Sequence, residues 1–364
     1  MRLHAASAAA AGVRGAGGPP HAGVNAAPFP AARRSVAVYN WALLQGERVM
    51  APPHSCLRLL AALLAAMFIA APAHAIIVYE TPGRLTTLPV LSGGVKPGWQ
   101  YIGNYNGFGG VPIGPRHWIT ATHVTAASMN FWYDNAGSTS FINYQGTRVA
   151  VNGDLAVAEL NAGQPDFTVW APVWSGTNNL FLGQQVYMYG YGTLRGAART
   201  GGWDWGAYDF ALSYGTNQLS GLSSVVGNTQ FRMTFTQPTG GNGLPGTEGI
   251  FSWGDSGSGL FSFNSTTGRW ELLGINSAVE QVSAMSGGSV LGAALYDARG
   301  YYDDEGNLIS GSSDKPLSSY AIGLPYYESF LAPYVVAVPE PATWSLLVAA
   351  VGVGFVARRM RCRR

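Results

Sequence analysis

The 364-residue sequence predicts an all-β domain, of the sandwich or barrel type, between residues 76 and 338. This stretch shows almost no helical periodicity. It consists instead of short runs rich in Val, Ile, Tyr, Phe and Trp, separated by clusters of Gly, Asn, Ser and Pro. Such a pattern is typical of short strands joined by turns. A length of about 260 residues suffices for one large all-β domain or for two small ones.

Local patterns place some of the elements. The runs at 183–190 and 269–275 have the composition of strands. The runs 261–263 and 270–272 enclose a polar turn, which predicts a hairpin. Residues 326–331 are the one segment for which we expect a helix, and we find no internal repeat.

The formal charge of +2 conceals a segregation of charge. Residues 1–75 carry six arginines and one acid, and residues 342–364 carry five arginines and no acid. Residues 76–338 hold ten Lys and Arg against seventeen Asp and Glu, a net charge of −7. Because the basic residues lie at the ends, nothing favours nucleic-acid binding.

Residues 50–75 have the order of a secretory signal peptide. A basic residue precedes an apolar run at 59–71, and the small-x-small triplet Ala73-His74-Ala75 follows it. The run is too short to span a membrane comfortably. A start at Met50 would place the signal at the N-terminus. Residues 1–49, rich in Ala, Gly, Pro and Arg, are then either an over-extended start or a disordered leader.

The other end has three parts in order: Pro339-Glu340-Pro341, an apolar run to Ala357, and an arginine-rich tail. By hydropathy this is a membrane anchor with a positive-inside tail. The full order of residues 338–364 resembles the PEP-CTERM sorting signal of Gram-negative bacteria. The resemblance implies passage across the inner membrane, a membrane-bound helix, processing by an exosortase, and a final place at the cell surface or in the extracellular matrix.

Only two cysteines occur, Cys56 and Cys362, and both fall in these terminal segments. We therefore expect a mature chain without cysteine, although the compartment that it would enter permits disulfides. Its fold must then rest on its hydrophobic core alone.

The stretch 254–259 (GDSGSG) is the strongest indication of chemistry. Glycines beside a serine allow a tight turn, on which two backbone N–H groups can point at one developing oxyanion. The serine hydroxyl also needs a histidine base and a carboxylate that orients this base. Residues 76–338 contain two histidines: His117, expected to be a solvated loop residue, and His123, at the end of an apolar run.

Asp154 is the candidate carboxylate, because it opens an alternating apolar run at 155–160. A buried aspartate there would need hydrogen bonds, such as those that orient an imidazole. On its own, the Asn-Gly-Asp sequence favours an ordinary turn. Glu159, in the same run, is expected to face outward.

Six segments resemble, in this order, the chymotrypsin-like (trypsin-family) serine peptidases. They are residues 108–110 (FGG), 118–123 (WITATH), 153–156 (GDLA), 190–192 (GYG), 254–259 (GDSGSG) and 274–277 (GINS). Thr122 stands where the family prefers alanine. The resemblance covers residues 76–335 and implies two six-stranded antiparallel barrels, with the active site between them and a short C-terminal helix.

The same resemblance implies the role of each site residue. Ser256 would attack the scissile carbonyl, His123 would take and return the proton, and Asp154 would fix the imidazole tautomer. The backbone N–H groups of Gly254 and Ser256 would form the oxyanion hole. Ser258, the alternative nucleophile, lacks the preceding Gly-Asp.

The resemblance also implies a substrate cleft lined by Gly190 and Ser277, with Ser277 supporting Asp154 as well. Ile250, six residues before the nucleophile, takes the place of the family's pocket floor. An isoleucine offers no charge, which argues against trypsin-like cleavage and favours apolar or small side chains. The disulfide that frames this pocket in many relatives is absent from the sequence, so the alignment with the family can slip by one residue here.

An activation step is implied for Asp255. In the family, a new N-terminal Ile or Val pairs with the aspartate that precedes the nucleophile. Cleavage after Ala75 would expose Ile76, so that removal of the signal peptide would itself complete the active site. Against this, residues 76–79 lack the glycines that the family has there, and the autotransporter branch of the superfamily does not depend on such insertion.

A long insert separates Ser277 from residues 320–327, which resemble the family's final strand and helix. The insert contains the acid-rich stretch 301–307 (YYDDEGN), which is either a calcium loop or a turn at the tip of a hairpin. Its spacing fits no defined metal motif, which favours the turn. We expect neither a metal nor a cofactor.

The leading functional prediction is an exported serine endopeptidase that cleaves protein or peptide substrates through an acyl-enzyme, either broadly or as a processing protease. Signal peptidase and exosortase would be its processing enzymes. The alternative is a catalytically silent surface or matrix binding protein on the same fold. No member of the triad is lost, which favours the enzyme.

Overall fold

The computed structural model describes residues 76–338, except for 81–84, 86, 125–127, 134–141, 178–179, 181, 209, 226 and 239–244. The predicted leader, signal peptide and sorting segment, with Pro339, Glu340 and Pro341, lie outside the described residues. Within the described ranges, no helix is long and apolar enough to cross a membrane.

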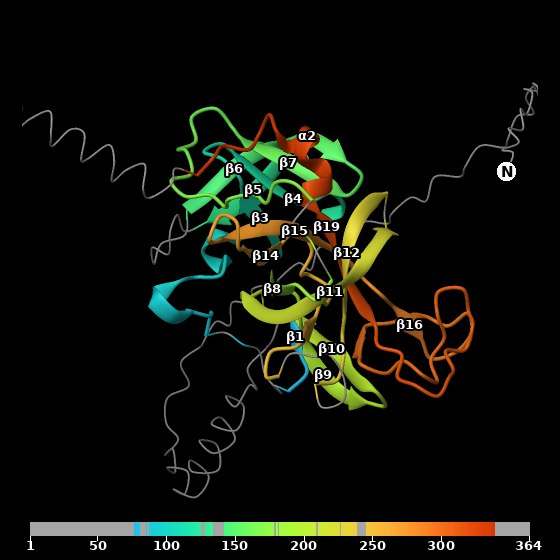
Figure 1. Cartoon of the computed structure of the whole chain (residues 1–364). Coiled ribbons are helices and arrows are strands. Elements are labelled where there is room, and N and C mark those ends of the chain that lie inside the picture. Colours follow the sequence, from blue (N-terminus) through green and yellow to red (C-terminus); the bar gives the residue numbers. More distant parts are fainter. Residues whose placement is uncertain are drawn as a thin grey trace, which may run out of the picture. The chain divides into compact units, whose positions relative to one another are not determined.

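The first half of the described chain forms a closed antiparallel barrel of six strands (Figure 1). The strand order around the barrel is β2-β3-β4-β7-β6-β5. The strands are β2 (Gly103–Tyr105), β3 (Phe108–Pro112), β4 (His117–Ala121), β5 (Ser128–Tyr133), β6 (Ile142–Asn152) and β7 (Leu155–Leu160).

The second half forms another closed antiparallel barrel of six strands, in the order β11-β12-β19-β15-β14-β8. The strands are β8 (Gln185–Gly190), β11 (Ser213–Val225), β12 (Asn228–Thr234), β14 (Gly259–Asn264), β15 (Arg269–Val279) and β19 (Ser318–Gly323). The predicted fold class, two six-stranded antiparallel barrels, is confirmed. A 3₁₀ turn, η4 (Leu324–Tyr327), and the short helix α2 (Glu328–Leu331) follow the last strand, where the helix was predicted.

Aromatic side chains fill the first barrel, because its strands place alternate residues on the inner face. Trp118 is fully buried and stacks on Phe131 with a centroid distance of 5.1 Å. Gly146 makes room for this indole: a Cβ at residue 146 would lie 2.2 Å from Cη2 of Trp118. Phe167 closes the cluster, 4.6 Å from the ring of Tyr144.

The predicted hairpin in the second barrel is also confirmed. β14 and β15 pair with Phe263 opposite Trp270 and Asn264 opposite Arg269. The rings of Phe263 and Trp270 meet edge to face at 5.8 Å.

The expectation for His117 is wrong. This residue begins β4, opposite Glu159 of β7, and its ring contacts Tyr334 at 5.2 Å instead of lying in a solvated loop. Partial burial lowers the pKa of His117 below its ordinary value, against the raising effect of Glu159. His117 lies in the ladder that builds the barrel wall.

Shorter strands connect the long insert (orange in Figure 1) to β9 and β10, and the N-terminal β1 to β13. A three-stranded sheet has the order β18-β10-β9, and two further pairs are β1-β13 and β16-β17. The strands are β1 (Ile77–Val78), β9 (Thr193–Arg199), β10 (Gly202–Tyr208), β13 (Gly249–Ile250), β16 (Val282–Ser283), β17 (Val290–Leu291) and β18 (Ala293–Leu295). The remaining 3₁₀ turns are η1 (Ser92–Gly94), η2 (Trp99–Tyr101) and η3 (Thr122–Val124).

These short strands share one hydrophobic cluster, the accessory core. Its fully buried members include Ile77 of β1, Ile250 of β13 and Leu295 of β18. Because Ile250 lies six residues before Ser256, the accessory core holds the segment that leads into the candidate nucleophile.

The acid-rich stretch of the insert is a turn. Tyr302 and Leu308 pair across it, and the carboxylate of Asp303 accepts the backbone N–H of Asn307 at 2.7 Å. Among the described residues, no group of three or more His, Cys, Asp or Glu is arranged to hold a metal ion.

The accessory core gives a stability prediction. Leu295→Ala removes a fully buried side chain and should lower the free energy of unfolding by about 2–5 kcal/mol. Leu308→Ala, in the same insert but 53% exposed, should change it by less than about 0.5 kcal/mol. Urea denaturation of both variants measures the difference, and equal stabilities would contradict a packed accessory core.

Candidate active site

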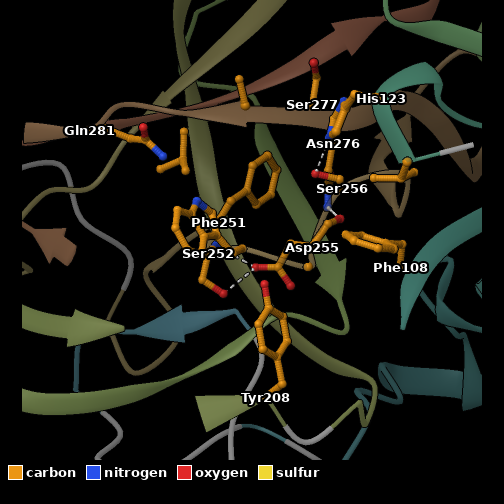
Figure 2. A pocket seen from close by; sticks show the side chains of 15 residues that line it. Phe108, His123, Tyr208, Phe251, Ser252, Asp255, Ser256, Asn276, Ser277 and Gln281 are labelled. Atoms are coloured by element: carbon orange, nitrogen blue, oxygen red, sulfur yellow. Dashed lines mark hydrogen bonds between the residues drawn. The ribbon is translucent and has the colours of Figure 1, made fainter. Parts of the chain in front are cut away.

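Three loops bring the predicted triad together at the junction of the barrels. His123 lies in η3, directly after β4, and Asp154 lies in the turn between β6 and β7 of the same barrel. Ser256 comes from the second barrel, in the turn between β13 and β14. Figure 2 shows His123 directly beside Ser256 at the cleft.

The three side chains form one hydrogen-bonded chain. Nδ1 of His123 lies 2.9 Å from both carboxylate oxygens of Asp154. Nε2 of the same ring lies 2.9 Å from Oγ of Ser256. With Nδ1 bound to a carboxylate, the proton of a neutral imidazole belongs on Nδ1, which leaves Nε2 as an acceptor for the serine hydroxyl. The imidazole is 45% exposed, whereas the aspartate is 2% exposed.

Hydrogen bonds satisfy the buried carboxylate of Asp154. Its Oδ1 accepts the backbone N–H of His123 at 3.1 Å, and its Oδ2 accepts the hydroxyl of Ser277 at 2.5 Å. Burial alone would raise the pKa of Asp154, but the hydrogen bonds from His123 and Ser277 outweigh it and hold the pKa below its ordinary value. The carboxylate therefore stays ionised beside the imidazole.

The backbone of Asp154 is anchored in the other barrel. Its N–H donates to Oδ1 of Asn228 at 2.5 Å, and the amide of Asn228 donates to the carbonyl of Asn152 at 3.0 Å. Asn228 is 1% exposed and begins β12. No local signal in the sequence distinguished this asparagine, because its partners lie 74 and 76 residues away.

The turn that carries Ser256 is clamped on both sides. The N–H of Gly109 donates to the carbonyl of Ser256 at 2.9 Å, and the N–H of Gly257 donates to the carbonyl of Asn276 at 2.9 Å. The alternative nucleophile, Ser258, is fully buried, and a Cβ at Gly109 would lie 1.9 Å from its hydroxyl oxygen. Ser256 and not Ser258 is the serine presented to His123.

Two backbone N–H groups beside Ser256 have no acceptor. Among the described residues, the N–H groups of Gly254 and Ser256 donate to no protein atom. Gly254 has φ +96°, a conformation open to glycine, and a Cβ there would lie 2.6 Å from Cε1 of Tyr208. The pair is available to bind an oxyanion at the reacting carbonyl.

The cleft in front of Ser256 has a volume of about 480 Å³ (Figure 2). One side is formed by the end of β15, Ser277–Val279. The other residues that line it include Phe108, Tyr208, Phe251, Trp253 and Gln281. Among its described lining residues there is no Lys, Arg or Glu, and the one acid is the buried Asp255.

Two residues expected in the cleft lie elsewhere. Ile250 is fully buried in the accessory core, opposite Ile77 of β1, and Phe251, the next residue, lines the cleft instead. The alternation of side chains along the backbone turns Ile250 away from the cleft, so that the lining residue comes one position later. Gly190 is also buried, and its absence of a side chain makes room for Asp255: a Cβ there would lie 1.8 Å from Oδ1.

Asp255 occupies a closed site beneath the nucleophile. Its carboxylate accepts the N–H of Gly192 at 2.9 Å, and the N–H and hydroxyl of Ser252 at 2.7 and 3.1 Å. The backbone N–H of Ile76 is a further donor to it. Burial raises the pKa of Asp255 to about 7, against the lowering effect of these hydrogen bonds.

Comparisons with known proteins add little to this geometry. A scan against known protein families finds no match, and a search of curated proteins finds none. Among solved structures, the chain is similar to neuropsin, described as a serine protease expressed in the limbic system of mouse brain. The identity is 14% and the TM-score 0.41, over 69% of this chain and 97% of that chain. The chymotrypsin-like fold rests on the two closed barrels and their strand order, not on this likeness.

Asn228 gives a prediction that needs no assumption about activity. Asn228→Ala removes the acceptor of the buried N–H of Asp154, which should lower the free energy of unfolding by about 1–3 kcal/mol. Asn143→Ala, at an exposed position of β6, is the matched control and should change it by less than about 0.5 kcal/mol. If the two variants unfold at the same urea concentration, the anchor is unimportant.

Proposed function

We propose that this protein is a serine endopeptidase that hydrolyses peptide bonds through an acyl-enzyme. One observation carries the proposal: the unbroken hydrogen-bonded chain from Asp154 through His123 to Ser256, with each link at 2.9 Å. A serine hydroxyl is a weak nucleophile, and this arrangement supplies the base that it needs.

The geometry supports a two-step reaction. Oγ of Ser256 attacks the carbonyl carbon while Nε2 of His123 takes the hydroxyl proton, and the resulting imidazolium is stabilised by the ionised Asp154. His123 then gives this proton to the leaving amine, and the C–N bond breaks. Water, activated by the same imidazole, hydrolyses the acyl-enzyme and restores the serine.

The N–H groups of Gly254 and Ser256 would stabilise the negative charge that develops on the carbonyl oxygen. Both N–H groups belong to a tight turn that fixes the backbone, so that they need not reorient when the charge develops. Preorganised donors of this kind contribute several kcal/mol to the transition state, since one of them is worth about 10²–10³ in rate.

The cleft favours uncharged side chains next to the scissile bond. Phe251, Trp253 and Val279 contribute apolar surface to it, and none of its lining residues would pair with a Lys or Arg of the substrate. We propose a preference for small or apolar residues, set by Phe251 in place of Ile250.

We propose that removal of the signal peptide activates the enzyme. Ile76 is fully buried, and its backbone nitrogen already donates to the carboxylate of Asp255. Cleavage after Ala75 would turn this N–H into an ammonium group, and a charged partner would keep the buried Asp255 ionised. Asp255 is directly bonded in sequence to Ser256, so that its position affects both oxyanion donors.

The place of action is proposed from the terminal sequences. Signal peptidase would remove residues 50–75 during export across the inner membrane of a Gram-negative bacterium. An exosortase would process the segment that begins at Pro339-Glu340-Pro341, and the enzyme would act at the cell surface or in the extracellular matrix. Peptide mapping of the secreted protein tests both cleavages, and a mature chain that retains residues 342–364 would contradict the second.

Labelling with a fluorophosphonate probe tests the activity. Protein produced from the full chain should react at Ser256, because the probe needs an activated serine and an oxyanion hole. Ser256→Ala should abolish labelling, and Ser258→Ala is the neighbouring-serine comparison that should retain it if it folds. Folded wild-type protein without Ser256-dependent labelling would support the silent binding protein instead.

The oxyanion donors give a second test. Gly254→Ala forces a Cβ against Tyr208 in a left-handed backbone, which should displace the N–H and lower kcat/KM by about 10²–10³-fold. Gly300→Ala has a similar φ, +91°, with no atom within 4 Å of the new Cβ, and lies far from the triad in sequence. This control carries the same backbone strain and should leave kcat/KM unchanged. A similar loss in both variants would mean that strain alone explains the effect.

The activation step gives a pH prediction. In a chain extended by one residue before Ile76, Asp255 has no ammonium partner, and its raised pKa means that the folded state binds a proton more tightly than the unfolded state. The extended chain should therefore lose thermal stability as the pH rises from about 4 to about 7, and should be much less active.

The mature chain, with an ammonium on Ile76, should show a smaller loss over the same pH range. Asp255→Asn in the extended chain should remove the loss. Thermal unfolding at several pH values and ester hydrolysis measure the two effects. An extended chain with full activity would overturn the activation step and leave the triad proposal intact.

A further inference from the structure

A second cavity, of about 660 Å³, lies next to the cleft of Ser256, and we call it the side cavity. No charged side chain is among its described lining residues. Its apolar surface comes from Leu88, Trp99, Trp132, Tyr191, Phe210 and Leu212. Trp132 and Phe210 are 43% and 59% exposed, so that two large apolar side chains stand open to solvent at one site.

Two aromatic rings join the cleft to the side cavity. Tyr208 lines the cleft and Phe210 lines the side cavity, and their rings stack with a centroid distance of 5.6 Å and an interplanar angle of 12°. One stacked ring pair therefore links the lining of the cleft to the lining of the side cavity.

Phe210 is held in place at an energetic cost. Its φ is +59°, which costs a non-glycine residue free energy, and its ring lies over the β2–β3 turn, where a Cβ at Gly107 would be 2.5 Å from Cδ1 of Phe210. An exposed aromatic residue in a strained backbone is not explained by core packing. It is explained if the ring serves as a binding surface.

The backbone around Ser256 sets the direction in which a peptide would cross the cleft. β15 passes the nucleophile at Asn276, whose carbonyl accepts the N–H of Gly257, and then continues through Ser277–Val279 along the cleft. On the edge of β15 that pairs with β14 as far as Ile275, no described strand pairs with Ser277–Val279. A substrate can add to the free edge as an antiparallel strand.

Antiparallel pairing makes such a peptide run from Val279 toward Ser256. Its acyl half then lies on β15, and its leaving half continues past Ser256 on the side of Phe108. Figure 2 shows Phe108 and Gln281 on opposite sides of the nucleophile. The side cavity lies on the Phe108 side, because Phe108 follows Gly107 in the turn that Phe210 covers.

The ladder of the first barrel gives the distance. Gly109 donates its N–H to the carbonyl of Ser256, and Asn104, its partner in β2, lines the side cavity. The steps from Ser256 to β3 and from β3 to β2 are each one strand spacing of about 4.8 Å, which places that wall roughly 10 Å from Ser256. An extended peptide of about three residues, at about 3.3 Å per residue, covers this distance.

We infer that the side cavity binds an aromatic or large aliphatic side chain of the substrate, at the second or third residue on the leaving side of the scissile bond. This inference rests on the proposed peptidase function. It assigns the enzyme a second recognition site, away from the side chain next to the cleaved bond, with Phe210 and Trp132 as specificity-determining residues.

Internally quenched peptides test the inference. They share one acyl half and differ at the second and third leaving-side residues, which are Phe, Leu, Ala or Asp. Burial of the apolar side chain predicts a kcat/KM at least about tenfold higher for Phe than for Asp at one of these positions. Phe210→Ala should lower this Phe-to-Asp ratio several-fold, and Trp132→Ala should lower it as well. Both side chains are substantially exposed, so that truncation does not threaten folding.

Phe263→Ala, which removes a 47% exposed aromatic side chain from β14, is the matched control and should leave the ratio at its wild-type value. A p-nitrophenyl ester with the same acyl half has no leaving-side residues and reports the triad alone. If the ester is hydrolysed but the leaving-side residue has no effect, or if the ratio survives Phe210→Ala, the inference is wrong and the proposed function stands. If neither ester nor peptide reacts, the proposed function itself fails.

Discussion

Hydrogen bonds across the junction of the two barrels hold the candidate site together. Asp154 belongs to the first barrel, yet its N–H and its carboxylate are bound by Asn228 and Ser277 of the second. In the other direction, Gly109 of the first barrel binds the carbonyl of Ser256. Buried hydrogen bonds of this kind are strongly directional, and leaving one unmade is expensive. These hydrogen bonds therefore restrict the two barrels to essentially one relative arrangement, in which His123 faces Ser256.

The described chain achieves this without a disulfide, because both cysteines lie outside it. The accessory core helps to hold the backbone near Ser256 in place. It buries Ile250 and Ile77 in one cluster with strands from the long insert, and so fixes the start of the segment that ends at Ser256. The insert, which has no obvious role in the chemistry, thereby supports the backbone that presents the nucleophile.

The cleft, which no Lys, Arg or Glu lines, and the side cavity would together form one recognition surface. In the proposed function, Phe251 and Val279 would favour small or apolar residues near the scissile bond, and such residues discriminate weakly because they provide little contact area. By our inference, the side cavity would add apolar surface about three residues from the cleaved bond. An exported peptidase that reads both positions would be more selective than its cleft alone allows. Charge would have little part in such selection, because no Lys, Arg or Glu is among the described lining residues of either cavity.

The sequence by itself determined the features that depend on near neighbours. Glycines around Ser256 specify a tight turn because they accept a positive φ, alternating apolar runs specify strands, and a short list of histidines leaves few candidates for a base. The resemblance of six ordered segments to the chymotrypsin-like peptidases then predicted the two barrels.

Tertiary structure decided what depends on distant partners. His117 became part of a strand, Ile250 turned away from the cleft, and Gly190 proved to make room for Asp255. Asn228 and the side cavity had no signal in the sequence, since their partners come from segments that are far apart in the chain. Such contacts are set by how the barrels pack against each other, and packing depends on shape and on buried hydrogen bonds across the whole junction, which no local pattern contains.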